Sequence, residues 1–174
     1  MQFKCNISKV TLLLGVALLF SSFKVFDWEY NKKYNSTINK SVTKIFNNHT
    51  YNLEELKDIN GSYYIIKNKK KILGYIVVAT APSKFHHFDY YIIFNKHTEI
   101  LKVEILKYRE NYGAEICSKK WLEKFIKIPT KDYVEYNRKV EGISGATISV
   151  NSIKKDVFNL SNILVKSIAE IEKK

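Results

Sequence analysis

Four stretches rich in aromatic and β-branched residues occupy the middle of the chain, and they constrain its fold more than any other feature. They cover residues 62–67, 72–79, 88–94 and 100–106. The first two stretches are separated only by a short polar turn at 68–71, and the last two are separated by a similarly short connection. Connections this short can join only antiparallel neighbours, so the sequence predicts two β-hairpins.

Helical patterns lie on both sides of these predicted strands. A weak apolar repeat predicts a short helix at 37–47, and residues 118–127 combine a capping serine with apolar residues along one side. The last helix is predicted at 151–171, where apolar residues recur at steps of three and four. The order of elements therefore predicts an α+β fold, in which an antiparallel sheet of two hairpins packs with helices, including a long C-terminal one.

The charge of the chain restricts its partners. The sequence of 174 residues has 29 Lys and Arg against 17 Asp and Glu, a net charge of +12. Almost all of the excess is lysine, because Arg109 and Arg138 are the only arginines. Domains that read nucleic-acid sequence depend on arginine for bidentate contacts, so we expect no nucleic-acid partner. The histidines and cysteines do not show the spacing of a metal site, and we expect none.

The first residues have the order of an export signal. Lys4 and Lys9 precede an apolar run at 10–20, which is shorter than the roughly 20 residues of a membrane-spanning helix. We expect a signal peptide or membrane anchor at 1–26, and hence a protein that is exported, either periplasmic or anchored to the outer face of the cytoplasmic membrane. A buried N-terminal helix is the alternative. The rest divides into a polar N-terminal segment with a short helix, at 27–60, and a domain at 61–174.

A short segment rich in glycine and hydroxyl residues, 141–149, lies between the predicted sheet and the last helix. It reads Glu-Gly-Ile-Ser-Gly-Ala-Thr-Ile-Ser. Its glycines allow close approach of a ligand to the backbone, and the N-terminus of the following helix favours phosphate. Since the hydroxyl of Thr147 comes shortly before that helix, the residues predict a phosphate beside it. A plain strand-to-helix turn, capped by Ser149 or Asn151, is the alternative.

Residues 144–147, Ser-Gly-Ala-Thr, with an acidic residue three positions earlier, resemble the FMN-attachment motif of the FMN-binding domain family. That family includes the flavin subunits of sodium-translocating NADH:quinone reductase and of the Rnf complex, as well as small exported flavoproteins. The resemblance implies a phosphoester between FMN and Thr147. It also implies maturation by a flavin transferase that uses FAD and a divalent metal and recognises Glu141, which stands where the family usually has Asp.

Residues 108–116 also resemble the family, in which a glycine-containing loop lies against the flavin ring. The resemblance thus extends from about Gly61 to the C-terminus. The residues that it implies for FMN are Thr147, Ser144, Gly145, Ala146, Ser149, Glu141, Glu110, Tyr112 and Gly113.

The expected function is that of an extracytoplasmic electron carrier rather than a stand-alone enzyme. The sequence has no dinucleotide-binding Gly-x-Gly-x-x-Gly motif and no phosphate-binding P-loop motif. A covalently held FMN would receive electrons from a membrane oxidoreductase and pass them to an acceptor that the sequence does not identify. Two alternatives stay open: a flavin-free extracytoplasmic module that binds phosphate or another anion, and a small covalent-flavin reductase.

Overall fold

The computed structural model describes residues 34–56, 62–126 and 137–173. The chain divides into two compact units after Ser41. In the first unit, the described residues 34–41 are helical; in the second, residues 42–46 are helical and precede the sheet. Helical residues 34–46 thus correspond to the helix predicted at 37–47. The expected signal or anchor segment, 1–26, lies outside the described residues.

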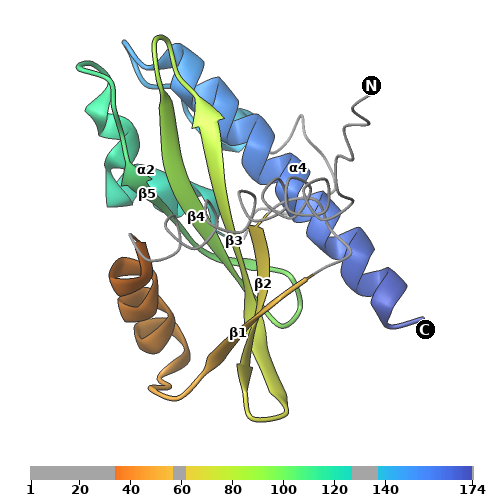
Figure 1. Ribbon diagram of the computed structural model, residues 1–174. Helices are drawn as coiled ribbons and strands as arrows, with labels where there is room; N and C mark the ends of the chain where they lie inside the picture. Colours follow the sequence, from red (N-terminus) through yellow and green to blue (C-terminus); the bar gives the residue numbers. More distant parts are fainter. Residues whose placement is uncertain (1–33, 57–61, 127–136, 174) are drawn as a thin grey trace, which may run out of the picture. The chain divides into compact units, whose positions relative to one another are not determined.

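One antiparallel sheet in the order β1-β2-β3-β4-β5 forms the centre of the second unit (Figure 1). Both predicted hairpins are confirmed, as β2–β3 and β4–β5, and the pairing of β3 with β4 joins them into one continuous sheet. The strands are β1 (Asn52–Glu55), β2 (Ser62–Asn68), β3 (Lys71–Pro82), β4 (His87–Asn95) and β5 (Ile100–Lys107).

The edge strand β1 was not predicted from the sequence. Its four residues, Asn-Leu-Glu-Glu, are all exposed and carry no apolar alternation. The strand exists because its backbone pairs with β2, from Asn52 opposite Lys67 to Glu55 opposite Tyr64. An exposed edge strand gains its order from backbone hydrogen bonds, which leave no periodic signal in the side chains.

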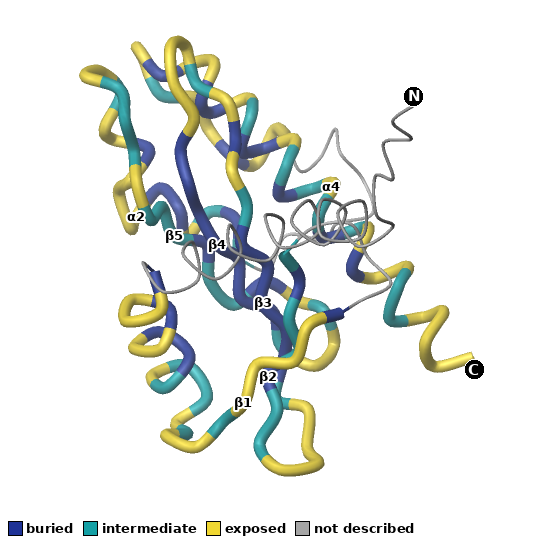
Figure 2. Tube along the Cα trace, in the orientation of Figure 1, coloured by how far each residue is buried: buried dark blue, intermediate teal, exposed yellow. Residues whose placement is uncertain are grey.

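The core forms where the long helix α4 (Thr147–Ile171) lies along the sheet (Figures 1 and 2). Strand β4 is buried from Phe88 to Phe94, and alternate residues of it join the same apolar cluster as the inner side of α4. The predicted apolar stripe is confirmed: Ile153, Val157 and Leu164 are buried, and Leu160 and Ile168 pack partly buried against them. None of the helices in the described ranges is both long and apolar enough to cross a membrane.

The helix predicted at 118–127 is instead a series of short helical turns. They are α2 (Lys119–Leu122) and η2 (Glu123–Phe125), and a further turn, η1 (Ala114–Cys117), precedes them. Ser118 occupies the expected capping position, but its side chain makes no capping hydrogen bond. Trp121, Leu122 and Phe125 are buried, so core packing determines the path of this segment more than helical propensity does.

A carboxylate of α4 lies between the helix and the sheet. The hydroxyl of Tyr90 donates a hydrogen bond to Asp156 Oδ2 at 3.3 Å. Burial raises the pKa of Asp156, although the bond from Tyr90 opposes the shift. On strand β2, which β3 separates from β4 in the sheet, burial and the Asp156 charge raise the pKa of Tyr63 to about 12. Folding therefore makes protonation of Asp156 easier than it is in the unfolded chain.

We expect Asp156→Asn to raise the melting temperature at pH 7. A carboxyl group whose pKa is raised by folding stabilises the protein fully below its unfolded pKa and loses that contribution as the pH rises through the folded value. The gain of Asp156→Asn should therefore shrink as the pH falls toward 4, the range of an unfolded Asp. Thermal unfolding across this range, with the exposed Glu170→Gln of the same helix as control, measures it. An equal gain in melting temperature at every pH would show that folding does not raise the pKa of Asp156.

Candidate functional site

Three segments that are far apart in the sequence enclose a cavity at one end of the sheet. They are the turn between β3 and β4, the stretch after β5 and the start of α4, which gather at the upper end of the sheet in Figure 1. The cavity has a volume of about 460 Å³, within the usual range of small-molecule sites. It is lined by Ser83, Lys84, Phe85, Tyr108, Glu110, Tyr112, Gly145, Ala146, Thr147, Ile148 and Ser149.

Helix α4 begins at Thr147, four residues before the predicted start at 151. Ala146 is its N-cap, and the hydrogen bond from Val150 N to Ala146 O (2.9 Å) starts the helical pattern. Thr147 is exposed and lines the cavity. The first N–H groups of a helix lack acceptors within it and favour an anion. The threonine hydroxyl and the helix N-terminus therefore occupy the same place.

The turn before α4 brings the two motifs of the sequence into contact. Gly145 has φ +78°, and Ala146 N donates to Ile143 O at 3.1 Å. Gly113, in the other motif, has φ +73°. A Cβ atom on Gly113 would lie 2.5 Å from Ala146 Cβ. The glycine therefore allows the segment after β5 to approach the residue that precedes Thr147.

Ser149 links the three walls of the cavity. It is 3% exposed, and its Oγ lies 2.7 Å from Ser83 Oγ and 3.0 Å from the Tyr108 hydroxyl. One hydroxyl of α4 thus contacts both the β3–β4 turn and the stretch after β5. The sequence predicts Ser149 as a phosphate contact, and the structure places it in the cavity lining and in this hydroxyl network.

Glu110 also lines the cavity and supports the β3–β4 turn. Its Oε1 accepts hydrogen bonds from Phe85 N (2.7 Å) and His86 N (2.9 Å). The bond from Phe85 N, with a smaller effect from His86 N, holds the pKa of Glu110 below its usual value. Tyr112, another predicted residue, lines the same cavity with an exposed side chain.

Three predicted residues do not line the cavity, and one of them is Gly113, which contacts the turn before α4. Ser144 is exposed and lies in the turn before α4. Glu141 is held outside the cavity, where its Oε2 lies 2.5 Å from Lys124 Nζ and its carbonyl accepts a hydrogen bond from Trp121 Nε1 at 2.9 Å. The hydrogen bond from Lys124 lowers the pKa of Glu141. Glu141 is thus tied to α2 and η2, and its side chain is still 77% exposed.

A lysine of α4 holds the chain that leads into the motif. Lys154 is 6% exposed, and its Nζ donates to Asn137 O and Val140 O, both at 2.6 Å. Desolvation lowers its pKa. Since Asn137 is the first of the described helical residues 137–139 and Val140 directly follows them, Lys154 fixes where the segment 141–146 begins.

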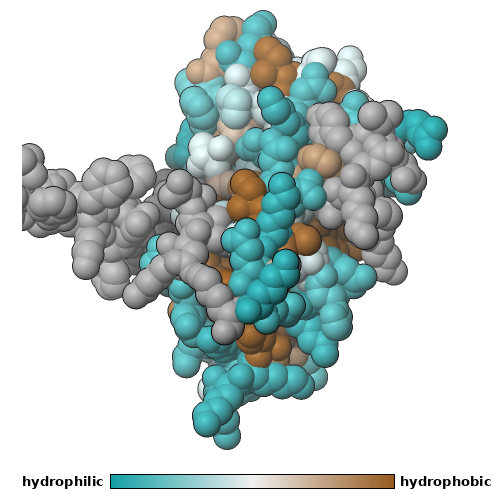
Figure 3. Space-filling view, turned by 90° about the vertical axis from the view of Figure 1, so that its right-hand side faces the viewer, coloured by the Kyte–Doolittle hydropathy of each residue, from teal (hydrophilic) through white to brown (hydrophobic). Residues whose placement is uncertain are grey.

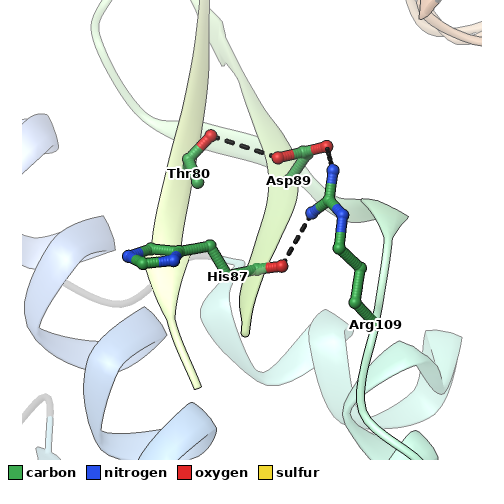
Figure 4. A network of polar contacts seen from close by, with 4 residues as sticks. All are labelled: Thr80, His87, Asp89 and Arg109. Atoms are coloured by element: carbon green, nitrogen blue, oxygen red, sulfur yellow. Dashed lines mark hydrogen bonds and ion pairs between the residues drawn. The ribbon is translucent and has the colours of Figure 1, made fainter. Parts of the chain in front are cut away.

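A polar network holds the start of the stretch after β5 against β4 (Figure 4). Arg109 Nη2 lies 2.5 Å from Asp89 Oδ2, and Nη1 donates to His87 O at 2.7 Å. Thr80 Oγ1 donates to the other carboxylate oxygen of Asp89 at 3.2 Å. The Asp89 side chain is nearly buried, so the guanidinium compensates a charge that water does not reach. The network fixes the direction in which the chain continues toward Glu110 and Tyr112.

Four residues of the lining, Ser83, Lys84, Phe85 and Ile148, were not predicted. Three of them form the β3–β4 turn, and a usable signal existed. In an antiparallel sheet, this turn must lie at the same end as the residues that follow β5. Phe85 is 72% exposed and Ile148 is 49% exposed. Figure 3 shows one face of the molecule, on which small hydrophobic patches interrupt a mainly hydrophilic surface.

Comparison with known families finds a match for part of the chain. Residues 87–161 match the sequence model of a family described as FMN-binding domain. The match begins at β4 and ends within α4, so it includes Glu110, Gly113 and Thr147 but not the turn at 83–86. No curated protein matches the chain significantly. Among residues 34–56, 62–126 and 137–173, no three His, Cys, Asp or Glu side chains gather as a metal site would require.

Proposed function

We propose, from the match of residues 87–161 to the FMN-binding domain model, that the protein is an extracytoplasmic electron-transfer flavoprotein with FMN attached covalently to Thr147. In this proposal it relays electrons from a membrane oxidoreductase to a separate acceptor. The observation that carries the proposal is the position of Thr147. This exposed residue ends the sequence Ser-Gly-Ala-Thr and is the first residue of a long helix. It also lines a cavity whose volume is in the range of small-molecule sites.

The residues of the cavity fit the chemistry of FMN. The phosphate would lie at the N-terminus of α4, where N–H groups and the helix dipole favour negative charge. A flat ring needs apolar or aromatic walls, and Tyr108 and Tyr112 line the cavity beside the attachment point. Ser149 and Tyr108 form hydroxyl contacts on the same lining. When bound, FMN supplies transfer of one or two electrons.

Attachment would be a phosphoryl transfer to the threonine. The oxygen of Thr147 would bond to the phosphorus of the FMN half of FAD, and the pyrophosphate bond of FAD would break. AMP would leave, and the hydroxyl proton would pass to solvent or to a base of the transferase. The helix N-terminus stabilises the charge of the phosphate that remains. This transferase, dependent on FAD and a divalent metal, is a proposed partner, and the exposed carboxylate of Glu141 is its proposed contact.

Location and redox partners complete the proposal. The basic and apolar order at residues 4–20 supports export, to the periplasm or to the outer face of the cytoplasmic membrane. A carrier rather than a stand-alone enzyme is supported by the rim of the cavity. The rim of the cavity carries three exposed hydrophobic side chains, Phe85, Tyr112 and Ile148, on which a partner protein could dock. Electrons can pass to such a protein without entry of a substrate.

The test is the intact mass of the exported protein, expressed with and without an active flavin transferase. We expect a gain of one FMN less one water only with the transferase, in a yellow protein. A known acceptor protein confirms that the transferase is active. If that control gains flavin and this protein does not, the proposal is wrong, and the motif is a structural turn or an anion site.

A further inference from the structure

The β3–β4 turn, residues 83–86, has no role in either sequence motif and precedes the family match. Nevertheless Ser83, Lys84 and Phe85 line the same cavity as Thr147. About a quarter of the lining residues thus come from a turn to which the FMN-attachment motif assigns no role. The turn is therefore a candidate for a separate role in the site.

Phe85 is the prominent feature of this turn. Its side chain is 72% exposed at the edge of the cavity. Lys84 Nζ lies 4.9 Å from the centroid of its ring. An exposed cation–π contact of this kind contributes little, so it does not account for an aromatic ring held in water. A ligand that covers the ring would remove apolar surface from water and so stabilise the complex.

The turn is held in place from several sides. Ser83 N donates to His86 O at 2.7 Å within the turn. Glu110 Oε1 accepts from Phe85 N and His86 N, and Ser83 Oγ lies 2.7 Å from Ser149 Oγ. Both other walls of the cavity thus hold the turn. A backbone fixed in this way carries Phe85 at a constant place relative to the attachment threonine.

We propose that the β3–β4 turn is a wall of the flavin site, with Phe85 stacked on the isoalloxazine ring and Glu110 as the positioning residue that holds the turn. The occupant is the ring of FMN tethered at Thr147, because that residue and Phe85 line one cavity. This inference rests on the proposed function. It assigns to Glu110 a backbone-holding role in place of direct contact with FMN.

The test compares flavin-loaded and flavin-free protein in a thermodynamic cycle. Each variant is made with and without the transferase, loading is verified by intact mass, and unfolding by denaturant is measured for both forms. The stabilisation that flavin adds should fall about 2- to 10-fold in unfolding equilibrium constant in Phe85→Leu, as expected for loss of one aromatic pair. Phe85→Tyr should keep it. A general structural effect would change both forms equally and cancel.

Glu110 is tested in the same cycle. Glu110→Ala should reduce the flavin-dependent stabilisation, whereas Glu110→Gln should retain it, because an amide oxygen can accept the same two N–H bonds. The matched control is Glu99→Ala, which removes a carboxylate from the β4–β5 turn, where Glu99 Oε2 accepts from Asn95 Nδ2 at 2.6 Å. It should leave the flavin-dependent part unchanged.

The outcomes separate the two proposals. Full FMN mass with the same flavin-dependent stabilisation in wild type and Phe85→Leu would overturn the stacking of Phe85 and leave covalent attachment intact. An equal loss in Glu110→Ala and Glu110→Gln would overturn the positioning role. No mass gain in the wild type, with an active transferase, would overturn both the proposed function and this inference.

Discussion

Thr147→Ala is expected to abolish covalent flavin incorporation completely while leaving the fold intact. The threonine oxygen is the atom that would carry the phosphoester, so its removal leaves no bond to form. Thr147 is exposed and is the first residue of α4, and alanine is favourable in a helix. The stability of the flavin-free protein should therefore change by no more than about 0.5 kcal/mol, as for other surface substitutions. Intact mass and denaturant unfolding check the two parts separately.

Two neighbouring hydroxyls provide the matched controls. Ser144 is exposed in the turn before α4, and Ser149 is buried with its Oγ near Ser83 and Tyr108. Ser144→Ala and Ser149→Ala should both still gain one FMN less one water. Ser149→Ala should also destabilise the protein by about 1–3 kcal/mol, because buried polar partners lose a hydrogen bond. A mass gain that persists in Thr147→Ala but disappears in Ser144→Ala would move the attachment to Ser144.

The sheet and the long helix could be predicted because their side chains carry the pattern. Strands β2 to β5 have dense aromatic and β-branched residues, and α4 has an apolar stripe. Strand β1 could not be predicted, since its exposed polar residues owe their conformation to backbone pairing with β2. The short turns from Ala114 to Phe125 likewise follow the packing of buried residues such as Trp121 rather than a helical repeat.

The sequence predicted those residues of the candidate site that belong to a recognisable motif. It was less informative for residues whose role depends on where the folded chain places them. Thr147 follows from the motif and the coming helix, although the helix begins there rather than at 151. Glu110 was predicted as a cofactor contact, and it lines the cavity while its carboxylate accepts hydrogen bonds from the backbone of the β3–β4 turn. Phe85 was missed because a lone phenylalanine belongs to no motif, and the signal that existed was only the position of its turn at the same end of the sheet as the residues after β5. Only the meeting of separate segments reveals its place.

The contact between the two motifs makes Gly113 sensitive to substitution. The stability lost on substitution of Gly113 can be compared with the losses at two other glycines. Gly142 has no atom within 4 Å of an added Cβ, and Gly145 has none either but has φ +78°. Gly113 combines φ +73° with an added Cβ only 2.5 Å from Ala146 Cβ. Gly142 thus has neither backbone strain nor a clash, Gly145 has backbone strain alone, and Gly113 has backbone strain together with a steric clash.

We expect the loss of unfolding free energy to increase in that order. Gly142→Ala should change it by less than about 1 kcal/mol, and Gly145→Ala should cost about 1–2 kcal/mol for the left-handed conformation. Gly113→Ala should cost about 2–5 kcal/mol, because overpacking adds about 1–3 kcal/mol to the same backbone cost. Denaturant unfolding of flavin-free protein measures the series. Equal losses at Gly113 and Gly145 would show that the approach to Ala146 costs nothing.

The same series connects stability with maturation. In Gly113→Ala the added methyl group must displace Ala146, the N-cap of α4 and the residue before Thr147. The Thr147 hydroxyl, the proposed acceptor of flavin, should then be misplaced, since positioning dominates the rate of a transfer between two held groups. Flavin incorporation, followed by mass over time, should be slower in Gly113→Ala than in Gly142→Ala under conditions in which both are folded. Equal rates would mean that contact between the two motifs serves stability alone, whereas a slower rate would show that it also presents Thr147 to the transferase.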